Sequence, residues 1–225
     1  NRFEAGFWLS VDAAFGIAKL NRLAKAANVV DKASDTAKVV NKLDDVERVS
    51  KTFKAEKVIL ENGEVAYKSA DLVNGQPVLV RSREFLDDAG RIKWPDADGF
   101  VVDSTGKAIT KPANLKAGDV IDRFGPPNGR FTSPVENGKI LDFDTRGLPY
   151  PEGYLEYYQY DVVKDISIKN VETGFSKLSD MDKQLLLAEM ERYGKNLNDL
   201  ANPKLGKISK VFGQGGGTQI QFETS

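Results

Sequence analysis

The sequence predicts an α+β fold arranged in three parts along its 225 residues. Between about residues 11 and 53, apolar residues recur every three or four positions, which is typical of amphipathic helices. From about residue 56 the apolar period changes to two, which indicates short strands. We expect a helical segment over 1–55, a small β-rich module over 56–112, and a compact, mainly antiparallel β-sheet domain with an inserted helix over 113–225.

The helical segment divides into one or two helices on this pattern. Ser10 is a plausible N-cap, and the stretch from Asn28 to Asp35 contains several poor helix formers, so a break is expected there. Two interpretations stay open for this part. It is either a helical hairpin or linker helix packed on its neighbour, or a docking segment for another protein.

The middle part contains two hairpin signals. Asn62 and Gly63 separate two apolar runs, and an Asn-Gly pair favours a tight turn because both residues tolerate positive φ. Residues 78–80 predict a further strand, and residues 100–109 predict a second hairpin around Ser104 and Gly106. We assign no chemistry to this part of the chain.

The last part predicts strands at 120–121, within 157–168 and at 220–222. Between the last two, Ser179 precedes acidic residues and an apolar pattern that ends at Gly194, which is typical of a capped helix. We expect this helix to be an insertion that covers a site or binds a partner.

Composition narrows the chemistry that is available. The chain contains neither cysteine nor histidine, which excludes thiolate metal sites, disulfides and Ser-His-Asp catalysis. A net charge of −1 argues against a nucleic-acid partner. Arginines, carboxylates, amides and hydroxyls are left to carry any reaction.

Hydropathy and the chain start suggest how the protein is delivered. No apolar run reaches the length of a membrane-spanning helix, and the first residues lack the layout of a signal peptide. The chain also begins at Asn1 rather than at Met. We therefore expect a piece of a larger secreted protein.

Two glycine-rich segments carry the strongest functional signal. Residues 122–131 read DRFGPPNGRF, and residues 212–219 read FGQGGGTQ. Glycines let the backbone approach a ligand closely, while the two prolines stiffen the turn. Arg123 and Arg130 match phosphate oxygens through their guanidinium forks, and Phe131 offers a stacking face. The segments thus predict an anionic, aromatic, nucleotide-like ligand.

Together with residues 146–149, RGLP, these segments resemble the catalytic domain of the tuberculosis necrotizing toxin family. Members of that family hydrolyse NAD to nicotinamide and ADP-ribose. The resemblance extends from about Leu115 to Phe222 and rests on four motifs in the right order. It implies a toxin domain that acts on NAD, with NADP as a further substrate, and that needs no cofactor. It also implies a cognate immunity protein, delivery as an effector and action in the cytoplasm of the target cell.

The resemblance assigns roles to eight residues. It implies Gln219, Arg146 and Arg123 as catalytic residues, with Gln219 on a ribose hydroxyl or the attacking water and Gln214 as its rival. The substrate-binding residues that it implies are Arg130, Phe131, Phe124, Tyr158 and Gly217.

The resemblance assigns a binding role to Tyr158 because the namesake toxin uses a histidine in this stretch, and this chain has none. Tyr157, Tyr158 and Tyr160 occupy that stretch, and fungal members resemble this arrangement more closely. Breaking the nicotinamide–ribose bond releases an already cationic ring as a neutral molecule, so no general acid is required. A site without histidine is therefore able to perform the reaction.

Ordinary structural roles remain alternatives. Arg123 and Arg130 are equally well explained by salt bridges to Asp119 or Asp122, and Phe131 by burial in a core. Asp142, Asp144 and Glu223 lie near the motifs, but we expect solvated surface carboxylates there. An ADP-ribosyltransferase, which normally needs a nearby glutamate, and a non-enzymatic interaction module are the competing functions.

Overall fold

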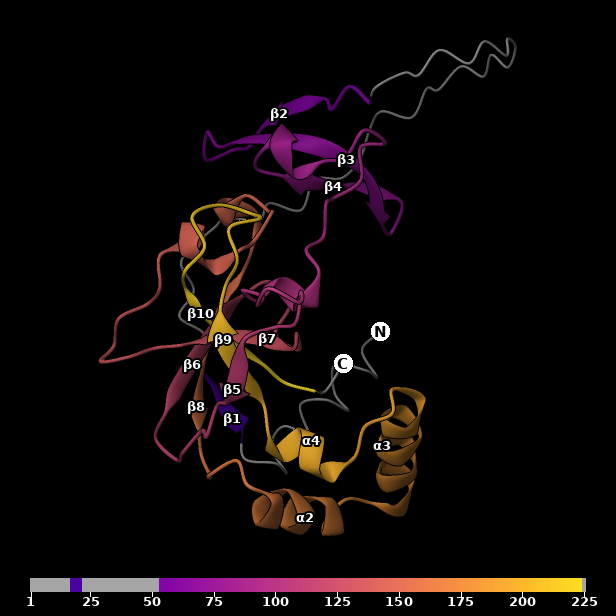
Figure 1. Ribbon diagram of the computed structural model, residues 1–225, viewed down its shortest axis with the longest axis vertical. Coiled ribbons are helices and arrows are strands. Elements are labelled where there is room, and N and C mark those ends of the chain that lie inside the picture. Colours follow the sequence, from indigo (N-terminus) through magenta and orange to yellow (C-terminus); the bar gives the residue numbers. More distant parts are fainter. Residues whose placement is uncertain (1–16, 22–52, 224–225) are drawn as a thin grey trace.

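The computed structural model describes residues 17–21 and 53–223, and nothing is said here of the remainder. This part of the chain consists of a small sheet, a large sheet and a group of helices, with the large sheet between the other two (Figure 1). All strand pairings within it are antiparallel. The predicted α+β class is confirmed.

The large sheet is assembled from distant parts of the sequence. Its two edge strands, β1 and β5, both come from the chain before residue 113. In spatial order its seven strands are β1 (Ile17–Asn21), β8 (Tyr157–Val162), β6 (Val120–Phe124), β7 (Phe131–Pro134), β10 (Thr218–Gln221), β9 (Lys204–Lys207) and β5 (Thr110–Pro112).

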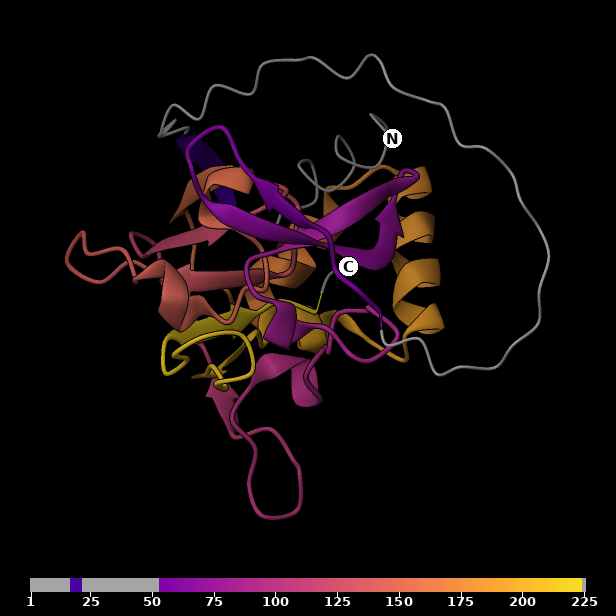
Figure 2. The same cartoon turned by 90° about the horizontal axis from the view of Figure 1, so that it is seen from above.

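The small sheet consists of β2 (Lys57–Ile59), β3 (Val65–Val73) and β4 (Gln76–Val80), and the view from above in Figure 2 places it in front of the rest of the molecule. The hairpin expected at Asn62 and Gly63 is confirmed, but only Gly63 has a positive φ, of 83°. Its N–H donates to the carbonyl of Leu60 at 2.9 Å. The connection is therefore a three-residue loop that ends in a left-handed glycine.

The second expected hairpin is also confirmed. Val102 and Ala108 form an antiparallel bridge, and Gly106 has a φ of 84° in the turn. The chain on either side of this hairpin already contacts the large sheet, because Phe100 bridges Ile208 and β5 pairs with β9.

The expected helix over residues 17–21 is wrong, because these residues form β1. This strand pairs with β8, placing Leu20 opposite Tyr160. Without it, β8 would present a row of unpaired backbone groups at a sheet edge, and satisfying them outweighs the local helical period. The other residues of the expected helical segment lie outside the described part of the chain.

Three helices follow β8: α2 (Ile168–Ser176), α3 (Asp180–Arg192) and α4 (Leu197–Ala201). The inserted helix expected after Ser179 is α3, and the Ser179 hydroxyl accepts from the N–H of Asp182 at 3.1 Å. The strand expected within 157–168 ends at Val162, and α2 begins at Ile168. These helices enclose a core of their own, formed by Val171, Leu186, Met190, Leu200 and Ala201.

A separate core supports the large sheet. It contains Ile121, Tyr158, Tyr160, Val162 and Ile220, all on inward-facing strand positions. Among the described helices, none has the length and apolar content needed to cross a membrane. Short 3-10 helices complete the fold: η1 (Arg83–Phe85), η2 (Ala97–Gly99), η3 (Phe143–Arg146) and η4 (Glu152–Tyr154).

The cap of α3 gives a direct test of this packing. Replacing Ser179 by alanine leaves the N–H of Asp182 without its acceptor and should lower the free energy of unfolding by about 1 kcal/mol. Urea denaturation measures the change. Ser104→Ala, in the exposed turn of the second hairpin, is the control and should have no measurable effect. Equal stabilities of the two variants would contradict the cap.

Candidate functional site

A pocket of about 900 Å³ opens where the small sheet meets the large one. Its wall is drawn from the β3–β4 turn, η2, the facing ends of β6 and β7, the chain after η3, and the glycine-rich loop before β10. This volume falls within the range of roughly 300–1,000 Å³ that is typical of small-molecule sites. Five of the eight predicted site residues line it, namely Arg123, Phe124, Phe131, Arg146 and Gln219.

Strand register explains how three of the four motifs meet. Asp122 of β6 pairs with Ser133 of β7, and Phe131 of β7 pairs with Gln221 of β10. Because side chains alternate along a strand, Asp122, Phe131 and Gln219 project from the same face of the sheet. The fourth motif arrives through Arg146, which contacts Asp122.

Arg146 and Asp122 form a buried bidentate ion pair. The Nη1 and Nη2 atoms of Arg146 donate to the two carboxylate oxygens of Asp122, each at 2.7 Å, and the side chains are 4% and 0% exposed. The guanidinium also lies over the ring of Phe124, at 5.0 Å from its centroid. Arg146 thus acts as the partner of Asp122, a role that the sequence assigned to Arg123 or Arg130.

Tyr157 completes this cluster. Its hydroxyl donates to Asp122 at 3.0 Å. Burial, followed by the nearby Asp122 carboxylate, raises the pKa of Tyr157, so the phenol stays protonated. Asp122 therefore accepts three hydrogen bonds and has little capacity left for a ligand.

Arg123 lies on the opposite side of β6, with its guanidinium beneath the turn 125–130. It donates from Nη1 to the carbonyl of Phe131 at 3.2 Å, while its Nε is buried without a partner. Burial lowers the pKa of Arg123. No ion pair joins it to a carboxylate anywhere in residues 53–223. A buried cation in this state favours an anionic ligand.

The turn itself is shaped around Arg123. A Cβ atom at Gly129 would overlap the guanidinium of Arg123, so a larger residue at this position would force that guanidinium to move. Arg130, next in sequence, does not line the pocket. Its guanidinium lies 5.3 Å from the ring centroid of Phe131 and 3.8 Å from the carboxylate of Asp98.

Gln219 is held by the η2 segment. Its Nε2 donates to the backbone carbonyl of Asp98 at 3.1 Å, and the Nε2 of Gln221 donates to the Asp98 carboxylate at 2.7 Å. These contacts fix the amide of Gln219 in the pocket wall.

Three other predicted residues lie outside the pocket wall. Tyr158 is buried in the core of the large sheet, and its hydroxyl donates to Glu156. Gly217 packs against the backbone of Thr145, where a Cβ would lie 2.5 Å from the carbonyl oxygen. Gln214, the rival amide, uses its backbone N–H to bind Asp144 at 3.2 Å.

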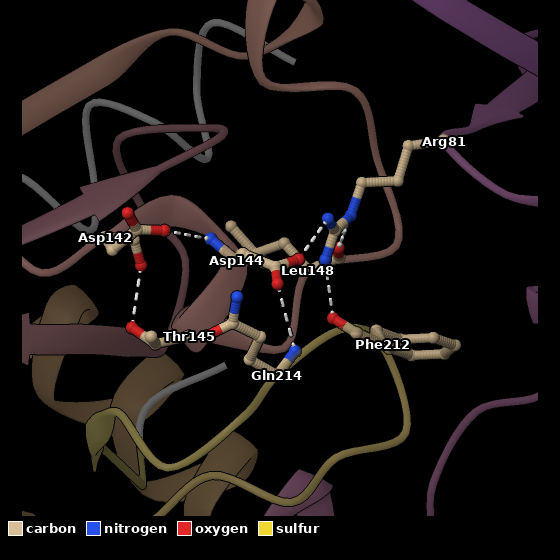
Figure 3. A network of polar contacts seen from close by, with 7 residues as sticks. All are labelled: Arg81, Asp142, Asp144, Thr145, Leu148, Phe212 and Gln214. Atoms are coloured by element: carbon tan, nitrogen blue, oxygen red, sulfur yellow. Dashed lines mark hydrogen bonds and ion pairs between the residues drawn. The ribbon is translucent and has the colours of Figure 1, made fainter.

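Arg81, at the end of β4, joins the small sheet to two loops of the pocket (Figure 3). Its Nε donates to the carbonyl of Leu148 at 3.1 Å, its Nη2 to that of Phe212 at 2.7 Å, and its Nη1 pairs with Asp144. Asp144 in turn accepts from Gln214. One guanidinium therefore holds the chain after η3 and the glycine-rich loop together.

Several of these residues carried no recognisable signal in the sequence. Arg81, Asp98 and Trp94 all belong to the part to which we assigned no chemistry. Trp94 lines the pocket beside Phe212, at 5.7 Å between ring centroids, and adds a second aromatic surface to that of Phe131. Asp144, expected to be a solvated carboxylate, instead belongs to the Arg81 network.

Comparison with known proteins agrees with the motifs in part. A family model described as tuberculosis necrotizing toxin matches residues 114–177, which include the first three motifs and not the glycine-rich one. This match supports a domain of that family within the chain, and the family is known for NAD glycohydrolase toxins. No curated protein was found to match the chain.

The ion pair between Arg146 and Asp122 predicts a stability effect. Arg146→Ala should lower the free energy of unfolding by about 3–5 kcal/mol, because it leaves a buried carboxylate uncompensated. The double variant Asp122→Leu/Arg146→Met should lose less than Arg146→Ala, since it buries no lone charge. Chemical denaturation distinguishes these cases. An Arg146→Ala protein of wild-type stability would contradict a stabilising role for this ion pair.

The Arg81 network predicts a local effect on the glycine-rich loop. Arg81→Lys keeps the charge and loses the fork, so backbone amides at 212–214 should exchange their hydrogens faster, whereas Arg83→Lys, in exposed η1, should not change them. The hydrogen bond from Arg81 lowers the pKa of Asp144 below its ordinary 3.8. The contribution of this pair to loop stability is therefore complete above about pH 3.8, the ordinary pKa of aspartate, and is lost as the pH falls through the lowered pKa of Asp144. Loop exchange that is insensitive both to Arg81→Lys and to acid would contradict the network.

Proposed function

We propose that this protein is a NAD glycohydrolase that cleaves the bond between nicotinamide and ribose, with NADP as a second substrate. The observation that carries the proposal is the shared pocket, whose wall contains Arg123, Phe131, Arg146 and Gln219 from four separate motifs. The family match over residues 114–177 supports the same activity.

The chemistry of the pocket suits a dinucleotide. The guanidinium of Arg123, which lies beneath the turn 125–130 and has no ion pair among residues 53–223, is the cation that we propose for the diphosphate. Two aromatic surfaces, at Phe131 and at Trp94, match the two rings of NAD. Gln219 offers an amide to a ribose hydroxyl or to the attacking water without titrating.

The reaction itself needs no titrating base near neutral pH. The transition state carries positive charge on the ribose while the nicotinamide ring loses its own. A site of fixed charges and dipoles can favour that redistribution. The Arg146–Asp122 pair is internally neutralised, so we propose that Arg146 maintains the pocket and that Arg123 and Gln219 contact the substrate.

We further propose that the domain is a delivered effector that acts in the cytoplasm of a target cell by depleting NAD, and that a cognate immunity protein neutralises it. The family match supports a toxin. Co-expression with the product of the neighbouring gene, scored by cellular NAD content, tests both parts of this proposal.

The activity is tested by incubating the protein with NAD and measuring nicotinamide release. Gln219→Ala should reduce kcat on the order of 100-fold through loss of a transition-state contact. Arg123→Lys should mainly raise KM, because a lysine keeps the charge but not the bidentate geometry. Arg91→Lys, at an exposed position, is the control.

A label on the ADP-ribose half of NAD separates the competing function. A glycohydrolase leaves all label in free ADP-ribose, whereas label retained on protein would indicate an ADP-ribosyltransferase. An absence of nicotinamide release under all conditions would refute both enzymatic functions.

A further inference from the structure

The pocket has one accessible carboxylate whose role the reaction leaves open. Among the described residues that line it, the acidic ones are Asp98 and Asp122. Asp122 is fully buried and bound to Arg146 and Tyr157, whereas the side chain of Asp98 is 49% exposed. We propose that Asp98 is a catalytic residue whose carboxylate contacts the nicotinamide ribose and stabilises the positive charge that develops there. This inference rests on the proposed glycohydrolase activity.

In the described part of the chain, only one of the two carboxylate oxygens of Asp98 accepts a hydrogen bond. Its Oδ2 accepts from Gln221 at 2.7 Å and lies 3.8 Å from Nη2 of Arg130, while Oδ1 has no partner among residues 53–223. A carboxylate fixed through one oxygen presents the other in a defined direction. Such preorganisation is what makes a charge effective in a transition state.

The backbone of the same segment is strained. Ala97 and Asp98 are consecutive non-glycine residues in the left-handed region, with φ of 54° and 55°. Each such residue costs on the order of 1–3 kcal/mol and persists only where the surroundings impose it. Here the amide of Gln219 bonds to the Asp98 carbonyl, and the N–H of Ser209 bonds to Gly99 at 2.8 Å. The strain places Asp98 directly beside Gln219.

The location of Asp98 fits the chemistry of the step. It adjoins Gln219, the amide proposed to hold the ribose, and lies on the same side of the sheet as Phe131, the proposed nicotinamide surface. As the C1′–N bond breaks, its electron pair leaves with neutral nicotinamide. Water then forms the new bond to C1′ and releases one proton to solvent. The carboxylate of Asp98 faces the positive charge that develops on the sugar.

Two variants separate the carboxylate from its backbone. Asp98→Asn keeps the shape, an oxygen that can accept from Gln221, and a residue type that tolerates the left-handed region. Asp98→Gly relieves the strain altogether. Both retain the backbone carbonyl that binds Gln219. Asp96→Asn, two residues away, exposed and outside the pocket wall, is the matched control.

We expect both Asp98 variants to lower kcat for nicotinamide release on the order of 100- to 1,000-fold, with KM and the affinity for ADP-ribose changed by less than about threefold. The control should match the wild type in activity, and both the control and Asp98→Asn should unfold at the wild-type denaturant midpoint within error. Asp98→Gly also removes the acceptor of the buried Gln221 amide, so its activity is compared alongside its measured stability. A purely structural role for Asp98 would instead change stability or ADP-ribose affinity.

The failures are distinguishable. A wild-type protein that releases nicotinamide, with both Asp98 variants within about threefold of it, overturns the role of Asp98 and leaves the glycohydrolase intact. Faster variants would also overturn it, because they would show that Asp98 restrains Arg130. A wild-type protein that releases no nicotinamide refutes the activity and the role of Asp98 with it.

Discussion

The buried ion pair of Asp122 and Arg146 is the interaction on which the pocket depends. It joins the β6 strand to the chain after η3, and both partners are almost fully withdrawn from water. Replacing one partner of such a pair destabilises a protein more than replacing both with apolar residues, because a single remaining partner is an uncompensated buried charge. Asp122 projects from the same face of the sheet as Phe131 and Gln219, so the pair lies on the pocket side. The arginine that resembles a catalytic residue of the family thus has a structural task whatever else it does.

Residues from the small sheet and from the chain that follows it also form part of the pocket wall. Arg81 holds the two loops that follow η3 and precede β10, and η2 supplies the segment that contacts Gln219. Neither lies within the residues matched by the family model. The site therefore combines strands within the matched range with wall residues that lie outside it.

The features that were predicted correctly depend on residues that are close together in the sequence. Gly63, Ser179 and the alternation before Val162 act within a few residues, and each produced the expected hairpin, cap or strand. The four motifs also predicted side chains that share a pocket. Pairings over long separations were not predictable in this way: Arg146 with Asp122, Arg81 with Asp144, and Asp98 with Gln221 are set by strand register and loop paths. Residues 17–21 show the same limit, since a partner strand decided their conformation.

The two outer strands of the large sheet, β1 and β5, have a practical consequence for anyone who isolates the part of the chain that carries the motifs. A fragment starting at residue 113 would strip both borders from the sheet and leave the backbone of β8 and β9 open along its length. Open borders of this kind recruit foreign strands and promote aggregation. The preceding chain therefore supplies both borders of the sheet that carries the motifs.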